Sequence, residues 1–276
     1  MVARAAIAHC RAMGDETIAF TRAEMDISDV ASVSRCLAEV KPDAVLNCAA
    51  YTNVDGAESD PGAPELANAI GVENLAAACR KLGSRFVTIS TDFVFDGGKT
   101  GFYTQRDTPN PLGVYGKTKL DGEIRARNVY ARTIIVRSGW IYGSDGTNFL
   151  SVVPQLLAKS DQIRAISDTY GTPTFAGDLA ARLRELAELD LPGIYHVTNT
   201  GEGTTYAGFA RKVCELSGID GNLVQDISDR ELNRPAPRPV NSKLACVISE
   251  PLGLAPLPQW EKALKGFLAS ERSLAG

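Results

Sequence analysis

Two side chains that could share acid–base chemistry, Tyr115 and Lys119, stand four residues apart in a stretch that reads as the start of a helix. Residues at this spacing lie on one helix face, whereas Lys117 would point elsewhere. A free tyrosine has a pKa of about 10, too high for efficient proton transfer at neutral pH. A nearby cation lowers that pKa, and an ammonium can also hold sugar hydroxyls. The pair therefore suggests a tyrosine acid tuned by a lysine, although helices also contain this spacing by chance.

Polar and small residues end the strand-like segments that precede this helix. Thr91 ends one segment, and its hydroxyl could hydrogen-bond a substrate carbonyl beside the tyrosine. Asn47 ends an earlier segment and is followed by Cys48, Ala49 and Ala50, which suit a place where a flat cofactor passes close by. Each residue alone is more often an ordinary strand end or helix cap. Together they form a candidate site at one edge of a sheet.

The first half of the chain alternates strand-like and helix-like segments. The expected strands are Thr17–Thr21, Ala44–Cys48, Arg85–Ser90 and Thr133–Arg137, and the expected helices are Val30–Val40, Pro64–Leu82 and Tyr115–Asn128. This alternation predicts an α/β fold of Rossmann type, a doubly wound parallel sheet with helices on both faces. Ligands of such sheets bind beyond the carboxyl ends of the strands, where Asn47 and Thr91 fall.

The second half of the chain is less regular. Its expected elements are the loop Gly171–Thr174, the helices Asp178–Leu189, Thr205–Ser217 and Pro258–Ala269, the strand Gly193–Val197 and the extended, proline-rich segment Asn233–Val240. We expect residues 1–147 to form a dinucleotide-binding domain and residues 148–276 a smaller, interleaved C-terminal substrate lobe. Residues 177–198 of that lobe would return to the sheet.

The composition argues against several classes of protein. The net charge of −4, with basic residues scattered, is unlike a nucleic-acid-binding protein or a membrane-surface protein. No apolar run approaches the length of a membrane span. The six cysteines form no Cys-x-x-Cys pair, and with only two histidines we expect no metal site and no Ser-His-Asp hydrolase. We expect a cytoplasmic monomer or homodimer whose His196 is a packed residue rather than a base.

The motifs around these residues resemble the extended short-chain dehydrogenase/reductase superfamily, and within it the dTDP-4-dehydrorhamnose reductase family. The resemblance covers nearly the whole chain, and its main stretches are Asn47–Asp55, Ser90–Asp96, Asn110–Lys119, Arg137–Gly143, Gly171–Thr174 and Arg238–Ser242. It implies an enzyme that uses NADPH, with NADH possible, to reduce the C4 keto group of dTDP-4-dehydro-L-rhamnose to dTDP-L-rhamnose. The partner would be this small-molecule sugar nucleotide.

The resemblance also implies a role for each site residue. Tyr115 would protonate the C4 oxygen, Lys119 would bind the nicotinamide ribose and tune Tyr115, and Thr91 would hydrogen-bond the carbonyl. The cofactor-binding residues would be Arg22, Asp26, Ile27, Asn47, Cys48, Ala49, Ala50, Tyr51, Asn68, Tyr115 and Lys119. The substrate-binding residues would be Thr52, Val54, Thr91, Asp92 and Trp140. An ordinary core aromatic is the alternative for Trp140.

The choice of NADPH also has a physical argument. An acidic residue after the second strand would bind ribose hydroxyls and repel a 2′-phosphate, but this region reads Phe20-Thr21-Arg22. Three positions depart from the family pattern and leave the exact sugar open. Phe93 stands where tyrosine is usual, Gly139 where serine is common and Thr169 where glutamine is common.

Other functions remain as alternatives on the sequence. One is another 4-keto sugar-nucleotide reductase or an epimerase, and another is a dehydratase, which would place a pair of acids beside Thr91 where this chain has only Asp92. The third is a non-catalytic, nucleotide-binding regulatory subunit of the same fold. The intact Thr91, Tyr115 and Lys119 favour an enzyme.

The start of the chain also differs from the family pattern. Family members begin with a strand and a glycine-rich turn that cradles the pyrophosphate, whereas this chain starts inside the region matching the first helix, and its first glycine is Gly14. The sequence therefore leads us to expect a shortened form. The absent strand would lie between Thr17–Thr21 and Ala44–Cys48, and the 276-residue form would bind NADPH poorly.

Overall fold

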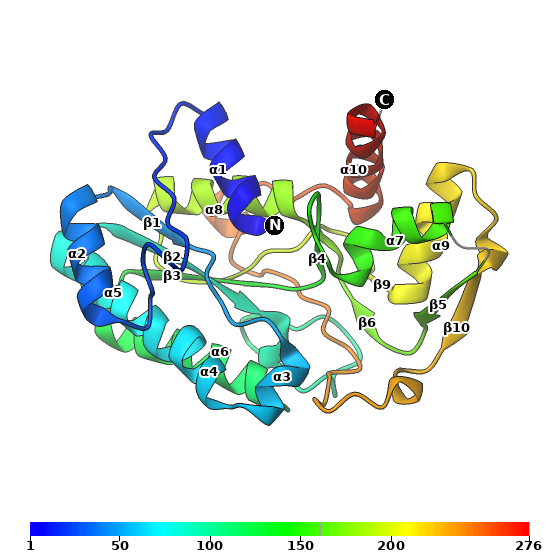
Figure 1. Ribbon diagram of the computed structural model, residues 1–276, viewed down its shortest axis with the longest axis horizontal. Coiled ribbons are helices and arrows are strands. Elements are labelled where there is room, and N and C mark those ends of the chain that lie inside the picture. Colours follow the sequence, from blue (N-terminus) through cyan, green and yellow to red (C-terminus); the bar gives the residue numbers. More distant parts are fainter. Residues whose placement is uncertain (160–161, 276) are drawn as a thin grey trace.

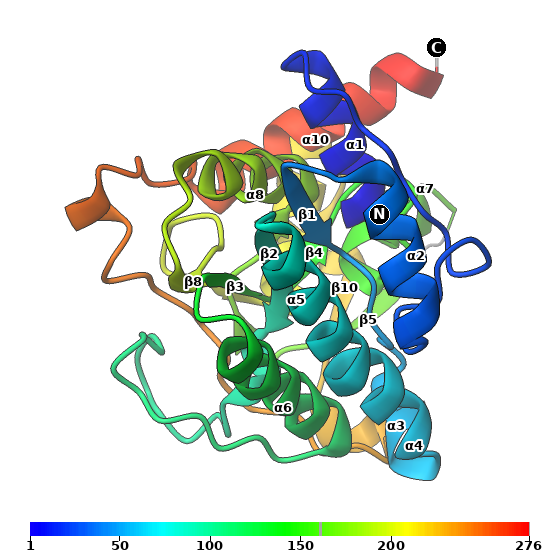
Figure 2. The same cartoon turned by 90° about the vertical axis from the view of Figure 1, so that its left-hand side faces the viewer.

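A parallel sheet with the strand order β1-β2-β3-β8 lies at the centre of the larger part of the molecule. The computed structural model describes residues 1–159 and 162–275, and within them the sheet strands are β1 (Ala44–Asn47), β2 (Arg85–Thr91), β3 (Thr133–Ser138) and β8 (Gly193–His196). β8 pairs with β3 although many elements separate them in sequence. Figure 2 shows the four strands side by side between two layers of helices.

Helices cover both faces of this sheet (Figure 1), and the predicted doubly wound α/β fold is confirmed. The helices of one face are α2 (Val30–Val40), α5 (Gly71–Leu82) and α6 (Val114–Val129), and those of the other are α1 (Val2–Ala12) and α8 (Ala176–Leu189). Neighbouring strand residues point to opposite faces, so Phe86 packs with Val72 and Leu75 whereas Val87 packs with Leu179 and Leu183.

Short elements lead into α5. The expected single helix Pro64–Leu82 is divided into α4 (Gly62–Glu65), a π-helical turn (Leu66–Ile70) and α5, and α3 (Val54–Ser59) comes before them. α5 ends at Gly83, which has the left-handed φ of 75° that favours glycine. The π-helical turn places the side chain of Asn68 in the interior, where it is 1 % exposed.

The expected strand Thr17–Thr21 is not formed, and this prediction was wrong. Residues 15–21 make no strand ladder, and β1 is the edge of the sheet in the described part of the chain. β-prone residues need a neighbouring strand to satisfy their backbone groups, and this segment has none beside it. Its apolar side chains Ile18 and Phe20 are 53 % and 36 % exposed.

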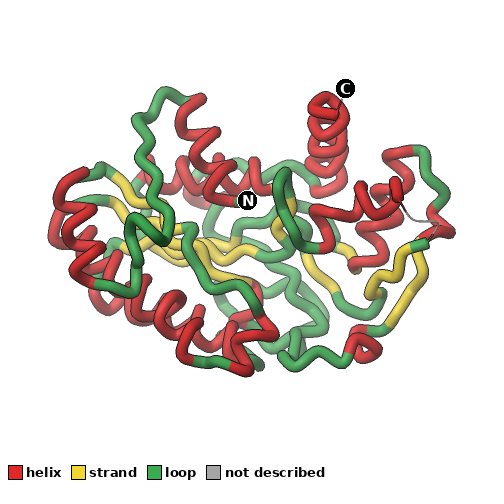
Figure 3. The backbone as a smooth tube through the Cα atoms, in the orientation of Figure 1, coloured by secondary structure: helices red, strands yellow, loops and turns green. Residues whose placement is uncertain are grey.

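A second region lies beyond the carboxyl ends of the strands, with loops between it and the sheet (Figure 3). Its helices are α7 (Phe149–Lys159), α9 (Tyr206–Ser217) and α10 (Trp260–Ala275). Its strand pairs are β5 (Ile163–Ile166) with β10 (Val224–Ile227), β4 (Ile141–Tyr142) with β7 (Thr174–Phe175), and β6 (Tyr170–Gly171) with β9 (Thr204–Thr205). Aromatic side chains fill its core, among them Tyr142, Phe209, Trp260 and Phe267.

The described residues contain no helix with the length and apolar character needed to cross a membrane. They also contain no cluster of three or more histidine, cysteine or carboxylate side chains arranged to hold a metal ion.

Candidate active site

The start of α6 carries Tyr115 to the carboxyl end of β2. A Cβ atom on Gly116 would lie 2.3 Å from the carbonyl oxygen of Phe93, so only glycine lets the helix approach the loop after β2 this closely. The ring of Tyr115 consequently meets that of Phe93 edge to face, with 5.8 Å between the ring centroids. The hydroxyl of Thr91, the last residue of β2, hydrogen-bonds the Tyr115 side chain.

Lys119 lies on the same face of α6 as Tyr115, and Lys117 points to solvent, as the four-residue spacing predicts. Lys119 is 4 % exposed, and its Nζ donates a hydrogen bond of 2.7 Å to the carbonyl oxygen of Ile89. Burial lowers the pKa of Lys119 to about 8, and the carboxylate of Glu123 acts in the opposite direction. An ammonium has three N–H donors, so two remain for a ligand such as a ribose diol.

The pKa of Tyr115 is shifted upwards, to about 12, and the expected tuning of Tyr115 by Lys119 stays a prediction. Burial of the phenol is the largest cause, the hydrogen bond with Thr91 opposes it, and the charge of Asp92 adds to the increase. Lys119 is directed at the Ile89 carbonyl instead of the phenol. Tyr115 is therefore held in its protonated form, which is the form that can donate a proton.

Asp92 is a buried carboxyl beside Thr91 and is 3 % exposed. The Thr91 hydroxyl donates to its Oδ1 at 3.1 Å, while Oδ2 makes no hydrogen bond of acceptable geometry within the described residues. Burial raises the pKa of Asp92 to about 6, although Ser242 lies close enough to oppose this shift. A Cβ atom on Gly139 would lie 2.3 Å from the carboxyl carbon, so this glycine provides the space that Asp92 occupies.

Trp140 lies directly after that glycine and has a left-handed φ of 51°, which is unusual for a bulky residue and marks local strain. Its ring stacks on Tyr206 with 4.0 Å between centroids, and a Cβ atom on Gly171 would lie 2.1 Å from it. Trp140 is 9 % exposed and belongs to the aromatic core of the second region. Most of the Trp140 surface is therefore buried, as expected for an ordinary core aromatic.

Tyr206 is a candidate site residue that the sequence reasoning missed. Burial raises its pKa to about 12, and the charges of Asp92, Arg234 and Arg238 also act on it. It therefore lies near enough to Asp92 and to the proline-rich segment to be influenced by the charges of both. Its position at the first turn of α9 was the available signal, but it gained meaning only once α9 was placed against Trp140.

Comparison with known proteins agrees with this geometry. The model of the RmlD substrate binding domain family matches residues 1–273. The chain is 40 % identical to the dTDP-4-dehydrorhamnose reductase of Streptomyces griseus over 91 % of this chain and 84 % of that protein. It is 37 % identical to the enzyme of the same name from Mycobacterium tuberculosis, over 93 % and 86 % respectively. The chain belongs to the dTDP-4-dehydrorhamnose reductase family.

A solved structure from this family is also similar. It is the dTDP-4-dehydrorhamnose reductase of Bacillus anthracis in complex with NADP, and it superposes with a TM-score of 0.87 at 33 % identity. The match covers 91 % of this chain and 89 % of that one. The family resemblance inferred from the motifs is therefore confirmed.

Some of the residues expected to bind the cofactor lie at the end of β1. Asn47 donates to the Thr88 hydroxyl at 3.0 Å and accepts from the backbone of Ala49 at 3.0 Å, so it shapes the turn after the strand. Ala49 is exposed, and Cys48, Ala50 and Tyr51 are half-buried. Burial raises the pKa of Cys48 to about 11, and Lys119 lies near enough to oppose that shift.

Asn68 has a positioning role in this structure. Its side chain accepts from the backbone of Tyr51 at 2.9 Å and donates to the Tyr51 carbonyl at 3.1 Å. Its amide also lies 3.3 Å from the Thr118 hydroxyl. These contacts fix the backbone of Tyr51 beside α6, and the expected cofactor contact of Asn68 stays a prediction.

The residues expected near the adenine lie in the segment that precedes α2, away from Thr91, Tyr115 and Lys119. Arg22 is exposed and pairs with Asp26 at 3.5 Å. Asp26 also accepts from the Ser28 hydroxyl and backbone, which lowers its pKa. Ile27 is 9 % exposed and packs with Val33 and Leu37 in the core.

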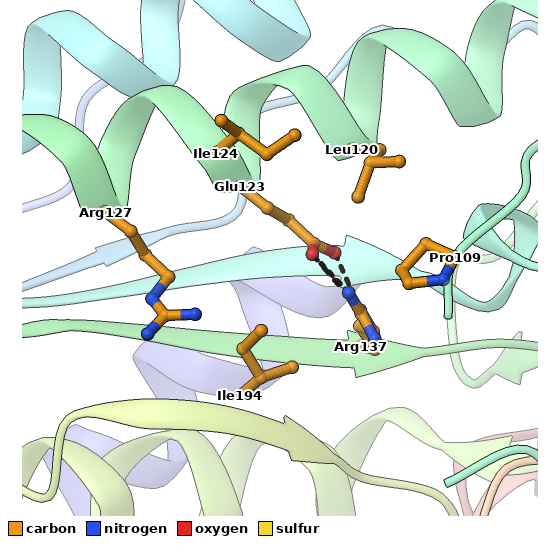
Figure 4. Close-up of a pocket in the computed structure, with 7 residues that line it drawn as sticks. All are labelled: Pro109, Leu120, Glu123, Ile124, Arg127, Arg137 and Ile194. Carbon is orange, nitrogen blue, oxygen red and sulfur yellow. Dashed lines mark hydrogen bonds and ion pairs between the residues drawn. The ribbon is translucent and has the colours of Figure 1, made fainter. Parts of the chain in front are cut away.

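Two expected substrate residues, Thr52 and Val54, flank the start of α3. Thr52 is exposed and Val54 is half-buried at the first position of the helix. Both stand in the segment that follows β1, at the same edge of the sheet as Thr91. A separate cavity of about 370 Å³ lies between α6 and β8 (Figure 4). Its lining includes Glu123 and Arg137, but Thr91, Tyr115 and Lys119 do not line it.

Proposed function

We propose that this chain catalyses the NADPH-dependent reduction of the C4 keto group of dTDP-4-dehydro-L-rhamnose, giving dTDP-L-rhamnose. The observation that carries the proposal is the placement of Tyr115, Thr91 and Lys119 together at the carboxyl end of β2. The NADP-bound structure of a family member supports the choice of cofactor. The family's two curated reductases named above support the choice of substrate.

The residues of the site divide the work of the reduction. NADPH, when bound, supplies the hydride that adds to C4. Tyr115, kept protonated by its buried position, donates its proton to the C4 oxygen, so that the carbonyl becomes a hydroxyl. Thr91 hydrogen-bonds the same oxygen and orients it. Lys119 is the donor available for the ribose next to the small residues after β1.

Asp92 would fix the orientation of the sugar. Its Oδ2 is a buried acceptor without a good partner, and such a group gains most from accepting a hydrogen bond of a ligand hydroxyl. Trp140 and Tyr206 would offer an apolar surface on the opposite side of the sugar. Phe93 and Gly139 are the positions through which this site would differ from relatives that reduce another 4-keto sugar nucleotide.

The wider assignments follow from the same reading. We propose residues 1–147 as the dinucleotide-binding domain and 148–276 as the substrate lobe, and the parallel pairing of β8 with β3 supports a return of residues 177–198 to the sheet. We further propose a cytoplasmic monomer or homodimer without nucleic-acid or membrane partners. The net charge of −4 and the free thiols of all six cysteines support this proposal. Light scattering on the purified protein measures the oligomeric state.

The deciding experiment follows NADPH oxidation by the purified protein with a panel of 4-keto sugar nucleotides. We expect dTDP-4-dehydro-L-rhamnose to give the highest kcat/KM, with the configuration of the product at C4 determined by NMR. Faster turnover of another 4-keto sugar nucleotide would assign the site to that sugar. No turnover of any member, with nucleotide binding retained, would favour the regulatory-subunit alternative.

A further inference from the structure

The face of α6 that carries the catalytic residues continues one turn beyond Lys119. Tyr115, Lys119 and Glu123 follow one another at four-residue steps, so they form one row directed at the sheet. Glu123 is 4 % exposed and lies one helical turn, about 6 Å of rise, past the lysine. A buried glutamate at this place is costly unless its charge is compensated.

Glu123 is held by two neighbouring strands. The hydroxyl of Ser90 on β2 donates to its Oε1, and Arg137 on β3 donates from Nε to Oε1 at 2.9 Å and from a terminal nitrogen to Oε2 at 2.6 Å. Figure 4 shows the carboxylate and the guanidinium facing each other between α6 and the sheet. Both side chains of this ion pair are 4 % exposed. The carboxylate is thus fixed in position as well as charged.

Within residues 1–159 and 162–275, Glu123 is the one carboxylate paired with Arg137. On its other side it faces Nε2 of His196 on β8, at 3.5 Å. Nδ1 of that ring lies 3.1 Å and 3.0 Å from the carbonyl oxygens of Tyr103 and Ala245, which assigns the ring proton to Nδ1. Burial and the neighbouring Arg137 lower the pKa of His196 to about 4, so the ring is neutral at pH 7.

The consequence for Lys119 is electrostatic. Its one hydrogen-bond partner among the described residues is a neutral carbonyl, and burial works against its charge. The titratable groups that act on its charge are Glu123 from α6 and Cys48 after β1. Beyond Glu123 lies its partner Arg137 on β3, which faces His196 on β8. Glu123 is the carboxylate that lies on the same face of α6 as Lys119. Without Glu123, the like charge of its partner Arg137 would be left uncompensated in the interior.

We propose that Glu123 is a positioning residue, whose fixed carboxylate on the same helix face keeps Lys119 charged at the candidate site. The consequence for catalysis rests on the proposed function, whereas the consequence for Lys119 itself does not. Glu123→Gln removes the carboxylate and leaves Arg137 unpaired. The apparent pKa of Lys119 should then fall by about one unit or more, and the alkaline limb of the kcat/KM profile should move to lower pH by the same amount.

The direct test is an NMR titration of protein labelled with ¹³C at the lysine Cε, with the Lys119 signal assigned through Lys119→Arg. Glu123→Asp keeps the charge, so it should retain most of the native Lys119 pKa despite its shorter reach. Asp121→Asn is the matched control, because it removes a carboxylate from the same helix that is 42 % exposed and paired with Arg125. It should leave the Lys119 titration and the pH profile unchanged.

A variant that fails to fold does not prevent the test. The double variant Glu123→Gln with Arg137→Gln removes both charges, and the pKa of Lys119 should fall less than in the single variant because the repelling cation is also gone. A Lys119 titration that is the same in wild type, single and double variants would overturn the proposal and leave the ion pair as a purely structural element. Lack of wild-type turnover would instead contradict the proposed function, without changing what the titration reports.

Discussion

The two sides of the candidate site differ in the kind of side chain that dominates them. On the sheet side, buried polar groups dominate: Asp92, Lys119, and the ion pair of Glu123 with Arg137. On the side of the second region, aromatic rings dominate, with Trp140 stacked on Tyr206. Buried charges are expensive and stay only where fixed partners hold them, whereas stacked rings stabilise by area and shape. The difference indicates that chemistry belongs to the sheet side and that the aromatic side contributes shape and stability.

Tyr115→Phe should have the largest effect on the sheet side. It removes the proton donor and keeps the ring that packs on Phe93, so turnover should fall about a hundred- to ten-thousand-fold while the protein stays folded. Steady-state kinetics and a melting curve measure the two effects. Near-normal turnover by the folded variant would show that Tyr115 is not the acid.

Phe267→Ala tests the aromatic side in the opposite way. Phe267 is 2 % exposed and packs edge to face on Tyr142, so its loss should lower the free energy of unfolding by about 3–5 kcal/mol. The folded fraction should keep its kcat, because the ring is remote from the catalytic trio. Denaturant unfolding and active-site titration measure both quantities. A fall in the kcat of the folded variant would contradict the conclusion that the aromatic side contributes stability and not chemistry.

Lys119→Met and Lys117→Met sharpen the comparison within α6. Lys119 is buried with donors available for a ligand, whereas Lys117 is exposed. Loss of a charged hydrogen bond costs about 1.5–3 kcal/mol, so Lys119→Met should weaken NADPH binding roughly tenfold to hundredfold. Calorimetric titration of NADPH gives the affinities, and Lys117→Met should bind like wild type. Equal losses in both variants would contradict the geometry of α6.

Asp92→Asn should have the smallest effect of these variants, and it should increase the stability of the protein. The folded pKa of about 6 lies above the ordinary aspartate value of 3.8, so ionisation of Asp92 opposes folding. Stability from the protonated carboxyl is fully present below about pH 4 and is lost as the pH rises through 6. At pH 7 the variant should therefore be more stable than wild type by about 1–3 kcal/mol, with no difference near pH 3.

Chemical denaturation at the two pH values measures this difference, and the same variant should bind the substrate less tightly. A pH-independent difference would show that the carboxyl is not a strained acceptor in the free protein. Ser242→Ala is a useful control, since it removes the neighbour that opposes the pKa shift without changing the charge.

The sequence by itself determined the alternation of elements, the row of Tyr115 and Lys119 on one helix face, and the placing of Asn47 and Thr91 at strand ends. These features depend on local periodicity and on the rule that parallel strands end at one edge of a sheet. The motifs also determined the family, which the comparisons confirm. Such properties are readable because neighbouring residues along the chain fix them.

Only the tertiary structure decided the properties that depend on partners distant in sequence. Thr17–Thr21 has β-prone residues but no strand beside it, Ile27 packs in a core with residues of α2 and α5, and Asn68 hydrogen-bonds the Tyr51 backbone. The direction of the Tyr115 pKa shift was likewise set by burial, which no local pattern reveals. The pairing of Glu123 with Arg137 joins a helix and a strand, and it arises because folding removes both charges from water together.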